Sequence, residues 1–169
     1  MSVKKIIVIG DLMLDVYHYC NTTRDAAEAN IPLYKINNTN YKLGGASNVA
    51  NNLNILFKNI KQDENQEIVF ISVIGEDESG KIIENLLLSK KIHVKLFVDS
   101  SRQTTQKIRL INENEVVGRY DIEYYKDISE QIQEDILNYI LSIRDVDSII
   151  ISDYAKGLIT NKLCKKIIE

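Results

Sequence analysis

Short apolar runs alternate with longer segments of helical spacing, and this alternation is the feature that most constrains the fold. Residues 4–9, 68–74 and 148–152 are rich in β-branched side chains, as is typical of strands buried on both faces. Residues 46–57 and 132–141 carry apolar side chains every three or four positions, which predicts helices. Strands that alternate with helices favour a mainly parallel sheet in an α/β sandwich.

Three further elements follow from the same patterns. Apolar residues between Ile82 and Leu87 predict another helix, and residues 93–98 predict a short strand. Thr160 has the side chain of an N-cap, so we expect it to begin a last helix that ends at Glu169.

Two regions interrupt the alternation. Residues 12–20 and 31–42 are polar and extended, and residues 103–111 and 115–122 read as a hairpin around Asn112-Glu113-Asn114. We expect these segments, which span about 12–42 and 103–122, to form a small antiparallel sheet beside the main one. Such an appendage would serve as a lid or as a dimer surface.

A glycine-rich run ends in a predicted helix start. Gly44 and Gly45 have no Cβ, so the backbone can approach a ligand closely. The first turn of the following helix offers free N–H groups, and Asn48 can both donate and accept hydrogen bonds. These properties suit a polyhydroxylated or anionic small molecule. A turn that merely starts a helix explains the glycines equally well.

Charged residues follow the first and the last predicted strands. In open parallel sheets, ligands bind beyond the carboxyl ends of the strands. Asp15 could accept hydrogen bonds from two hydroxyls there, and Asp153 with Lys156 would suit a phosphorylated ligand. The alternatives are a turn-capping aspartate and a local ion pair. No G-x-G-x-x-G follows the first strand, which disfavours a nicotinamide cofactor.

The predicted hairpin carries its own charges. Lys107 and Arg109 share one face of a strand, and Arg119 and Asp121 lie on the next strand. These side chains could reach over a sugar phosphate. Solvated strand faces are the alternative explanation for each residue taken alone.

Composition limits the class of protein. The 169 residues suffice for one domain with its own core, and a net charge of −3 gives no reason to expect nucleic acid. Cys20 and Cys164 have no metal or disulfide spacing, and no apolar stretch is long enough to span a membrane. We therefore expect a cytoplasmic protein without a metal site, a nucleic-acid partner or a membrane partner.

Four motifs together resemble those of the PfkB, or ribokinase-like, family of sugar kinases. Within that family, the resemblance is strongest to the heptose-7-phosphate kinase domain of the bifunctional enzymes that make ADP-heptose. The motifs occur in the family's order: residues 8–15, 44–50, 105–109 with 119–121, and 152–157. Each motif alone is moderately specific, and the four in order are strongly so.

The resemblance implies a ribokinase-like α/β fold, with a parallel sheet between helices and a β lid that covers the sugar and mediates homodimerisation. It implies a substrate site for a sugar or sugar phosphate and a pair of residues near the phosphate-transfer path. The substrate site would comprise Asp15, Gly44, Gly45, Asn48, Lys107, Arg109, Arg119 and Asp121. The pair would be Asp153 and Lys156.

The sequence also departs from the family pattern. The resemblance implies use of ATP and magnesium, but the family's Gly-Ala-Gly-Asp motif, with its general base and anion hole, is not in the sequence. The resemblance assigns the mid-domain Asn-x-x-Glu motif that helps place magnesium, and the ATP base pocket, to parts of the kinase domain that these residues do not match. We therefore expect residues 1–169 to be the N-terminal part of a kinase domain, with no catalytic base of its own.

Three interpretations remain open. The chain could be one half of a split kinase, a non-catalytic sugar-binding or dimerisation module, or a remnant without a ligand. A sheet that lacks its remaining strands would expose an edge and apolar surface. A rearranged C-terminus, a second copy or a partner chain could cover that surface.

Overall fold

The structure is a computed structural model that describes residues 4–27, 31–59, 66–90 and 92–169. Its body is a parallel sheet of four strands in the order β5-β4-β1-β8. The strands are β1 (Lys4–Gly10), β4 (Gln66–Ile74), β5 (His93–Val98) and β8 (Val146–Ser152). All four were predicted from their apolar runs, so the expected parallel sheet is confirmed.

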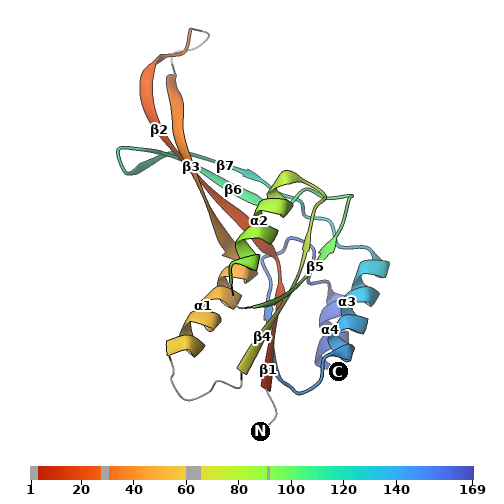
Figure 1. The fold of residues 1–169 in the computed structure, drawn as a ribbon. Helices are drawn as coiled ribbons and strands as arrows, with labels where there is room; N and C mark the ends of the chain where they lie inside the picture. The colour runs from red at the N-terminus through yellow and green to blue at the C-terminus, as the bar shows by residue number, and fades with distance from the viewer. Residues whose placement is uncertain (1–3, 28–30, 60–65, 91) are drawn as a thin grey trace.

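Four helices lie on the two faces of this sheet (Figure 1). They are α1 (Ala46–Asn59), α2 (Glu78–Leu88), α3 (Glu130–Ser142) and α4 (Asn161–Ile168). Side chains alternate along β1, so Val8 packs in the core with α1 and α2, while Ile7 and Ile9 pack in the core with α3 and α4. None of the described helices is long and apolar enough to cross a membrane.

The last helix begins as predicted. The Thr160 hydroxyl accepts a hydrogen bond from the Leu163 amide at 3.0 Å, which is the contact of an N-cap. The same hydroxyl donates to the Gln133 side chain at 2.7 Å, and both residues are buried. The cap of α4 therefore also ties it to α3.

A second sheet stands beside the body, in the order β3-β2-β6-β7. Its strands are β2 (Leu12–Asp25), β3 (Pro32–Gly45), β6 (Gln106–Asn112) and β7 (Glu115–Ile122). Figure 1 shows the β2–β3 ribbon projecting from the body as a long arm. Residues 28–30 of the expected lid lie outside the described residues.

The second sheet is mixed, and this corrects the expectation of a purely antiparallel lid. β2 pairs antiparallel with β3, and β6 pairs antiparallel with β7, but β2 and β6 run parallel. A parallel pair needs a long crossover, and here β3 and a large part of the body separate the two strands in sequence. The predicted hairpin itself is confirmed, with Glu113 and Asn114 in the left-handed region of its tight turn.

The two sheets meet where β1 continues into β2 through Asp11. Apolar side chains on one face of the second sheet, Leu14, Val16 and Ile108, are buried in the same core as Val8 of the first sheet. The other face of these strands carries the charged residues. The fold thus places a polar sheet face near the carboxyl ends of β1 and β8.

Candidate functional site

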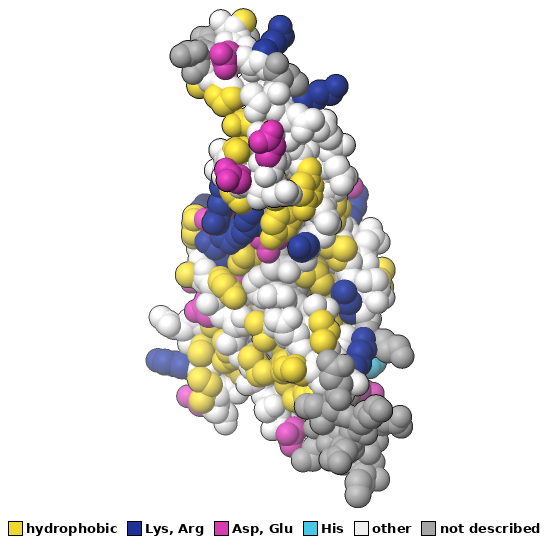
Figure 2. Space-filling model, turned by 90° about the vertical axis from the view of Figure 1, so that its left-hand side faces the viewer, with side chains coloured by type: hydrophobic (Ala, Val, Ile, Leu, Met, Phe, Trp, Pro, Cys, Tyr) yellow, Lys and Arg dark blue, Asp and Glu magenta, His cyan; other side chains and the backbone are white. Residues whose placement is uncertain are grey.

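The charged residues of the second sheet lie in register across three strands. Asp15 of β2 is opposite Lys107 of β6, and Lys107 is opposite Asp121 of β7. Two positions further along β6, Arg109 is opposite Arg119 of β7. Figure 2 shows basic and acidic side chains intermixed at mid-height on one face of the molecule. Register alone therefore brings together the five charged residues of the expected substrate site.

Asp15 and Arg109 form the best-defined ion pair of this face. Arg109 Nη1 donates to Asp15 Oδ1 at 2.7 Å, and both side chains are largely buried, with 22% and 18% of their surface exposed. The Arg109 guanidinium also lies over the Tyr17 ring, 5.1 Å from its centroid. The Asp15 carboxylate is therefore held in one orientation and retains acceptor capacity for a hydroxyl.

The Asp15 carboxylate lies directly against Gly44. A Cβ at Gly44 would collide with Asp15 Oδ2, so only glycine allows this approach. Gly45 has a positive φ of 58°, and α1 begins at the next residue, as predicted. Asn48 is exposed in the first turn of α1 and has no hydrogen-bond partner in the part of the chain that the structure describes. The Asp15 carboxylate, the backbone of Gly44 and Gly45, and the side-chain amide of Asn48 thus lie around one turn.

A second group of charges joins β6 to β7. Arg119 donates to both oxygens of Asp121, at 2.9 and 2.7 Å, and Lys107 Nζ lies 3.3 Å from Asp121 Oδ2. The hydrogen bonds from Arg119 lower the pKa of Asp121 to about 2. Arg119 is the most exposed of the three, with 48% of its side chain accessible.

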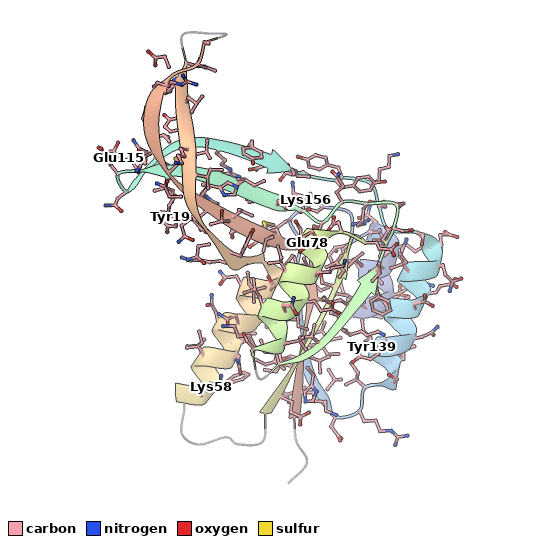
Figure 3. The ribbon with its side chains drawn as sticks, turned by 45° about the horizontal axis from the view of Figure 1, so that its top comes forward. Tyr19, Lys58, Glu78, Glu115, Tyr139 and Lys156 are labelled. Atoms are coloured by element: carbon pink, nitrogen blue, oxygen red, sulfur yellow. The ribbon has the colours of Figure 1, made fainter. Side chains whose placement is uncertain are left out.

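Glu123 connects this group to Lys156. Its Oε1 atom lies 3.3 Å from Lys107 Nζ and 2.9 Å from Lys156 Nζ, while Oε2 accepts from the Tyr125 hydroxyl. The hydrogen bonds from Tyr125 and Lys156 lower the pKa of Glu123 to about 2. Figure 3 shows Lys156 close to the ends of β6 and β7. Lys156 therefore joins the charged face, as an ion-pair partner of a residue outside the motifs.

Asp153 stands apart from these contacts. It is exposed, and its carboxylate accepts from the Ala155 amide at 2.7 Å within its own loop. Ala155 has a positive φ of 55°, so this contact stabilises a strained turn. The described contacts give Asp153 the role of a turn cap.

Sequence reasoning missed three residues that shape the site: Asp11, Glu123 and Arg102. Asp11 lies in the motif at residues 8–15 but was assigned no role, although a buried aspartate needs hydrogen-bond partners. Arg102 donates to Asp99 at 2.9 Å and to the Lys156 carbonyl at 3.2 Å, so it braces the loop after β8. Glu123 follows β7 without any motif that marks it.

The described residues do not fit a magnesium site. Among them, no group of three or more His, Cys, Asp or Glu side chains converges closely enough to hold a metal ion. Lys156, in the loop after β8, and Lys107, on β6, could each pair with a phosphate. Both ammonium groups instead contact the Glu123 carboxylate. We therefore derive no step through ATP or magnesium from these residues.

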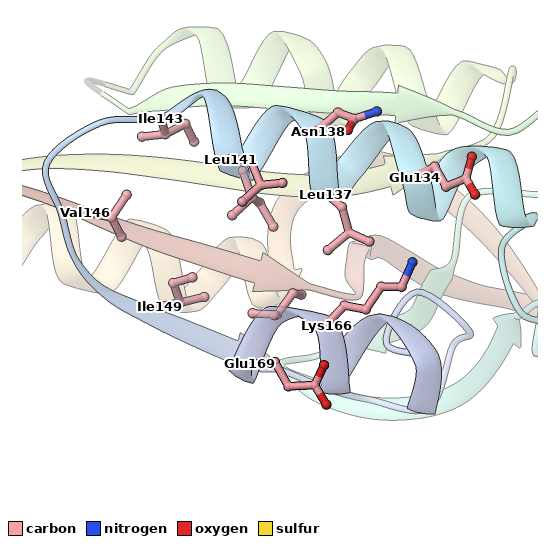
Figure 4. Close-up of a pocket in the computed structure, with 11 residues that line it drawn as sticks. Glu134, Leu137, Asn138, Leu141, Ile143, Val146, Ile149, Lys166 and Glu169 are labelled. Carbon is pink, nitrogen blue, oxygen red and sulfur yellow. The ribbon is translucent and has the colours of Figure 1, made fainter.

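An apolar groove of about 700 Å³ lies elsewhere, between α3, α4 and the free edge of β8 (Figure 4). Leu137, Leu141, Val146 and Ile149 are among the residues that line it, with Lys166 at its rim. None of the expected sugar or phosphate residues lines this groove. We place the candidate site at the charged sheet face, because polar groups converge there.

Comparison with known proteins agrees with the motifs. The sequence profile of the pfkB family carbohydrate kinases matches residues 3–168. Proteins named "Bifunctional protein HldE" are 38% identical over 167 residues in Helicobacter hepaticus and 39% identical over 166 residues in Aliarcobacter butzleri. These matches cover 98% and 97% of this chain but 33% of each relative, so the chain spans about a third of their length.

Solved structures support the fold. A putative phosphofructokinase from Staphylococcus aureus superposes on 96% of this chain with a TM-score of 0.69 at 14% identity, over 47% of its own length. Phosphofructokinase-2 from Escherichia coli, in complex with fructose-6-phosphate, superposes on 99% of this chain with a TM-score of 0.61 at 16% identity, over 51% of its own length. The fold is therefore ribokinase-like, and the chain belongs to the PfkB family of carbohydrate kinases.

Proposed function

We propose that this chain binds a sugar or sugar phosphate and forms the sugar-holding half of a heptose-7-phosphate kinase-like domain. The observation that carries the proposal is the Asp15 carboxylate, which Arg109 orients and which lies directly against Gly44. Carboxylates and amides that face bare backbone are suited to sugar hydroxyls, because they accept and donate in fixed directions.

Each group has a distinct role in this proposal. Asp15 accepts from hydroxyls, Asn48 pairs with another hydroxyl, and Gly44 and Gly45 let the sugar reach the backbone. Arg109 orients the Asp15 carboxylate, and Lys107 pairs with the carboxylates of Asp121 and Glu123. Arg119, whose side chain is about half exposed, retains donors for a phosphate at the far end of the ligand.

We propose further that the chain does not transfer phosphate by itself. Phosphoryl transfer depends on positioning and on charge stabilisation around the γ-phosphate. The sequence has no Gly-Ala-Gly-Asp motif, and the described residues offer no cluster for magnesium. Any use of ATP and magnesium would then require groups from outside residues 1–169.

Calorimetric titration with a heptose 7-phosphate tests the binding proposal. We expect measurable heat with the wild-type chain and about fivefold weaker binding for Asn48→Ala, since one hydrogen bond contributes about 1 kcal/mol. Asn52→Ala is the matched control, because Asn52 is also exposed on α1 but lies one turn further from Gly45. Absence of heat with any sugar phosphate would contradict the proposal.

A split kinase is the second candidate, and the free edge of β8 favours it. β8 pairs with β1 on one side, and no described strand pairs with its other side. The apolar groove lies along that edge, and the superposed kinases are about twice as long as this chain. We propose that the second half of a PfkB kinase domain, from further sequence or from another polypeptide, docks there by adding a parallel strand.

The split arrangement has its own test. A polypeptide that carries a Gly-Ala-Gly-Asp motif is mixed with this chain, and ATP consumption is followed with a heptose phosphate. The account predicts consumption only when both chains are present, and its loss with Ile149→Lys in the groove. Activity of the 169-residue chain alone would exclude this version.

We also propose a homodimer through the second sheet and a cytoplasmic location. Apolar side chains are exposed on β2, β3 and β7, among them Ile36, Val116 and Tyr120, with 49%, 61% and 52% of their surface accessible. Apolar residues, in yellow, extend along this arm in Figure 2. Light scattering should give twice the chain mass for the wild type and the chain mass for Val116→Lys with Tyr120→Lys.

A further inference from the structure

We infer that Asp11 is a positioning residue that fixes the Lys156 loop relative to the Gly44–Asn48 turn. The inference rests on the proposed function, because it names the residue that joins the two halves of the candidate sugar site. Asp11 lies between β1 and β2, at the point where the two sheets meet.

The Asp11 side chain holds the loop after β8 through three backbone amides. Oδ2 accepts from the Tyr154 amide at 2.9 Å and from the Lys156 amide at 3.1 Å, and Oδ1 accepts from the Leu158 amide at 3.1 Å. Only 3% of the residue is exposed, and no side-chain cation in the described ranges pairs with it. The loop amides therefore satisfy the hydrogen-bonding capacity of this buried carboxyl group.

The main chain of Asp11 holds the other half of the site. Its carbonyl accepts from the Ala46 amide at 2.9 Å, and its amide donates to the Ser152 carbonyl at 3.1 Å. A Cβ at Gly45 would collide with the same Asp11 carbonyl, so the turn packs directly on this residue. The start of α1 and the end of β8 are therefore both hydrogen-bonded to the Asp11 backbone.

The loop needs external ties to keep its shape. Ala155 has a positive φ of 55°, which is unfavourable for a residue with a Cβ, and Gly157 has a positive φ of 87°. Arg102 and the Ile128 amide bind carbonyl groups of the loop, at 3.2 and 2.9 Å. Among the described side chains outside the loop, Asp11 is the one that binds its amides. Its carboxylate thus sets where the Lys156 ammonium emerges.

The side chain and the main chain of Asp11 therefore have separable tasks. A change of the side chain should release the loop while leaving the turn in place. If the carboxylate were merely structural, its replacement would weaken the whole fold without singling out Lys156. This difference makes the inference testable.

Amide exchange is the first test, and it needs no ligand. In the wild type we expect slow exchange at Tyr154, Lys156 and Leu158. In Asp11→Asn these amides should exchange at least tenfold faster, because the carboxamide accepts fewer hydrogen bonds, while those of Ala46 and of β4 stay unchanged. Fast exchange of the three amides already in the wild type would overturn the inference, even if the variant does not fold.

A binding cycle with heptose 7-phosphate is the second test. Lys156 acts on the proposed site through Glu123, which also pairs with Lys107. Lys156→Ala should therefore weaken binding about tenfold in the wild type but less than twofold in Asp11→Asn. Asn48→Ala should weaken binding by the same factor in both backgrounds, because the turn is held by the backbone. An undiminished effect of Lys156→Ala in Asp11→Asn would overturn the coupling. If the wild type binds no sugar phosphate, the proposed function fails, and the exchange experiment alone decides the positioning role.

Discussion

Arg109 of β6 donates to Asp15 of β2 at 2.7 Å, although the two residues are 94 positions apart in the chain. The contact is possible because β2 and β6 run parallel with Asp15 opposite Lys107, which places Arg109 two residues along the same face. This ion pair defines the orientation of the carboxylate that we assign to sugar hydroxyls.

Asp15→Asn should abolish this orientation without removing the side chain's volume. We expect a loss of sugar phosphate affinity of about 10- to 100-fold, since hydrogen bonds to a charged group contribute about 1.5–3 kcal/mol. Calorimetric titration gives the affinity. Arg109→Lys should weaken binding less, because an ammonium can still pair with Asp15. Equal affinities for the wild type and Asp15→Asn would remove Asp15 from the site.

Gly44→Ala should weaken sugar binding because its methyl group would displace the Asp15 carboxylate. Gly118→Ala is the matched control in the same sheet, since its Cβ would lie 3.3 Å from a flexible Leu110 methyl group. We expect at least a tenfold loss for Gly44→Ala and less than a twofold change for Gly118→Ala, both by calorimetry. Loss of binding in the control would point to a general effect on the sheet.

The charged face should make stability depend on acidic pH. Asp121 and Glu123 have pKa values of about 2 in the folded protein, below those of unfolded chains. Their ion pairs therefore stabilise the fold above about pH 5, and that contribution is lost as the pH falls toward 2. Solvent screening limits each contribution to about 1 kcal/mol.

Urea denaturation between pH 2 and pH 6 measures this dependence. The double variant Asp121→Asn with Glu123→Gln should show a flatter decrease in the free energy of unfolding than the wild type. Glu115→Gln, an exposed glutamate on the same hairpin, is the control and should leave the slope unchanged. Identical slopes for the wild type and the double variant would contradict the ion-pair account.

Thr160→Ala should destabilise the protein by about 2 kcal/mol. The change removes the N-cap of α4 and leaves the buried Oε1 atom of Gln133 without the Thr160 donor. Lys162→Ala, two residues further along, breaks only the exposed pair with Glu130 and should change the free energy of unfolding much less than Thr160→Ala does. Thermal unfolding of both variants compares the two contributions.

The body of the fold could be predicted because buried strands and helix faces leave apolar patterns within short stretches of sequence. Apolar runs identified β1, β4 and β8, and Thr160 marked the start of α4 through its own chemistry. The parallel pairing of β2 with β6 was missed, since strand direction depends on a crossover and leaves no local pattern. The lid was therefore expected to be antiparallel.

In the site, too, local features could be predicted and long-range contacts could not. Gly44 and Gly45 could be found because a close approach and a positive φ require glycine. The roles of Glu123 and Asp11 could not be predicted, because Lys156 lies more than 30 positions from Glu123 and the amides that bind Asp11 lie more than 140 positions from it. Lys156 was expected to meet an anion of the ligand, and the structure places it against Glu123. Long-range partners of this kind are set by the fold.

The central claim is that the Gly44–Asn48 turn and Asp15 hold a sugar. Titration of the isotope-labelled chain with a heptose 7-phosphate, followed by amide chemical shifts, tests it residue by residue. The account predicts saturable shifts at Gly44, Gly45, Asn48 and Asp15, and none along the groove between α3 and α4. Shifts confined to that groove, or no shifts at millimolar ligand, would contradict it.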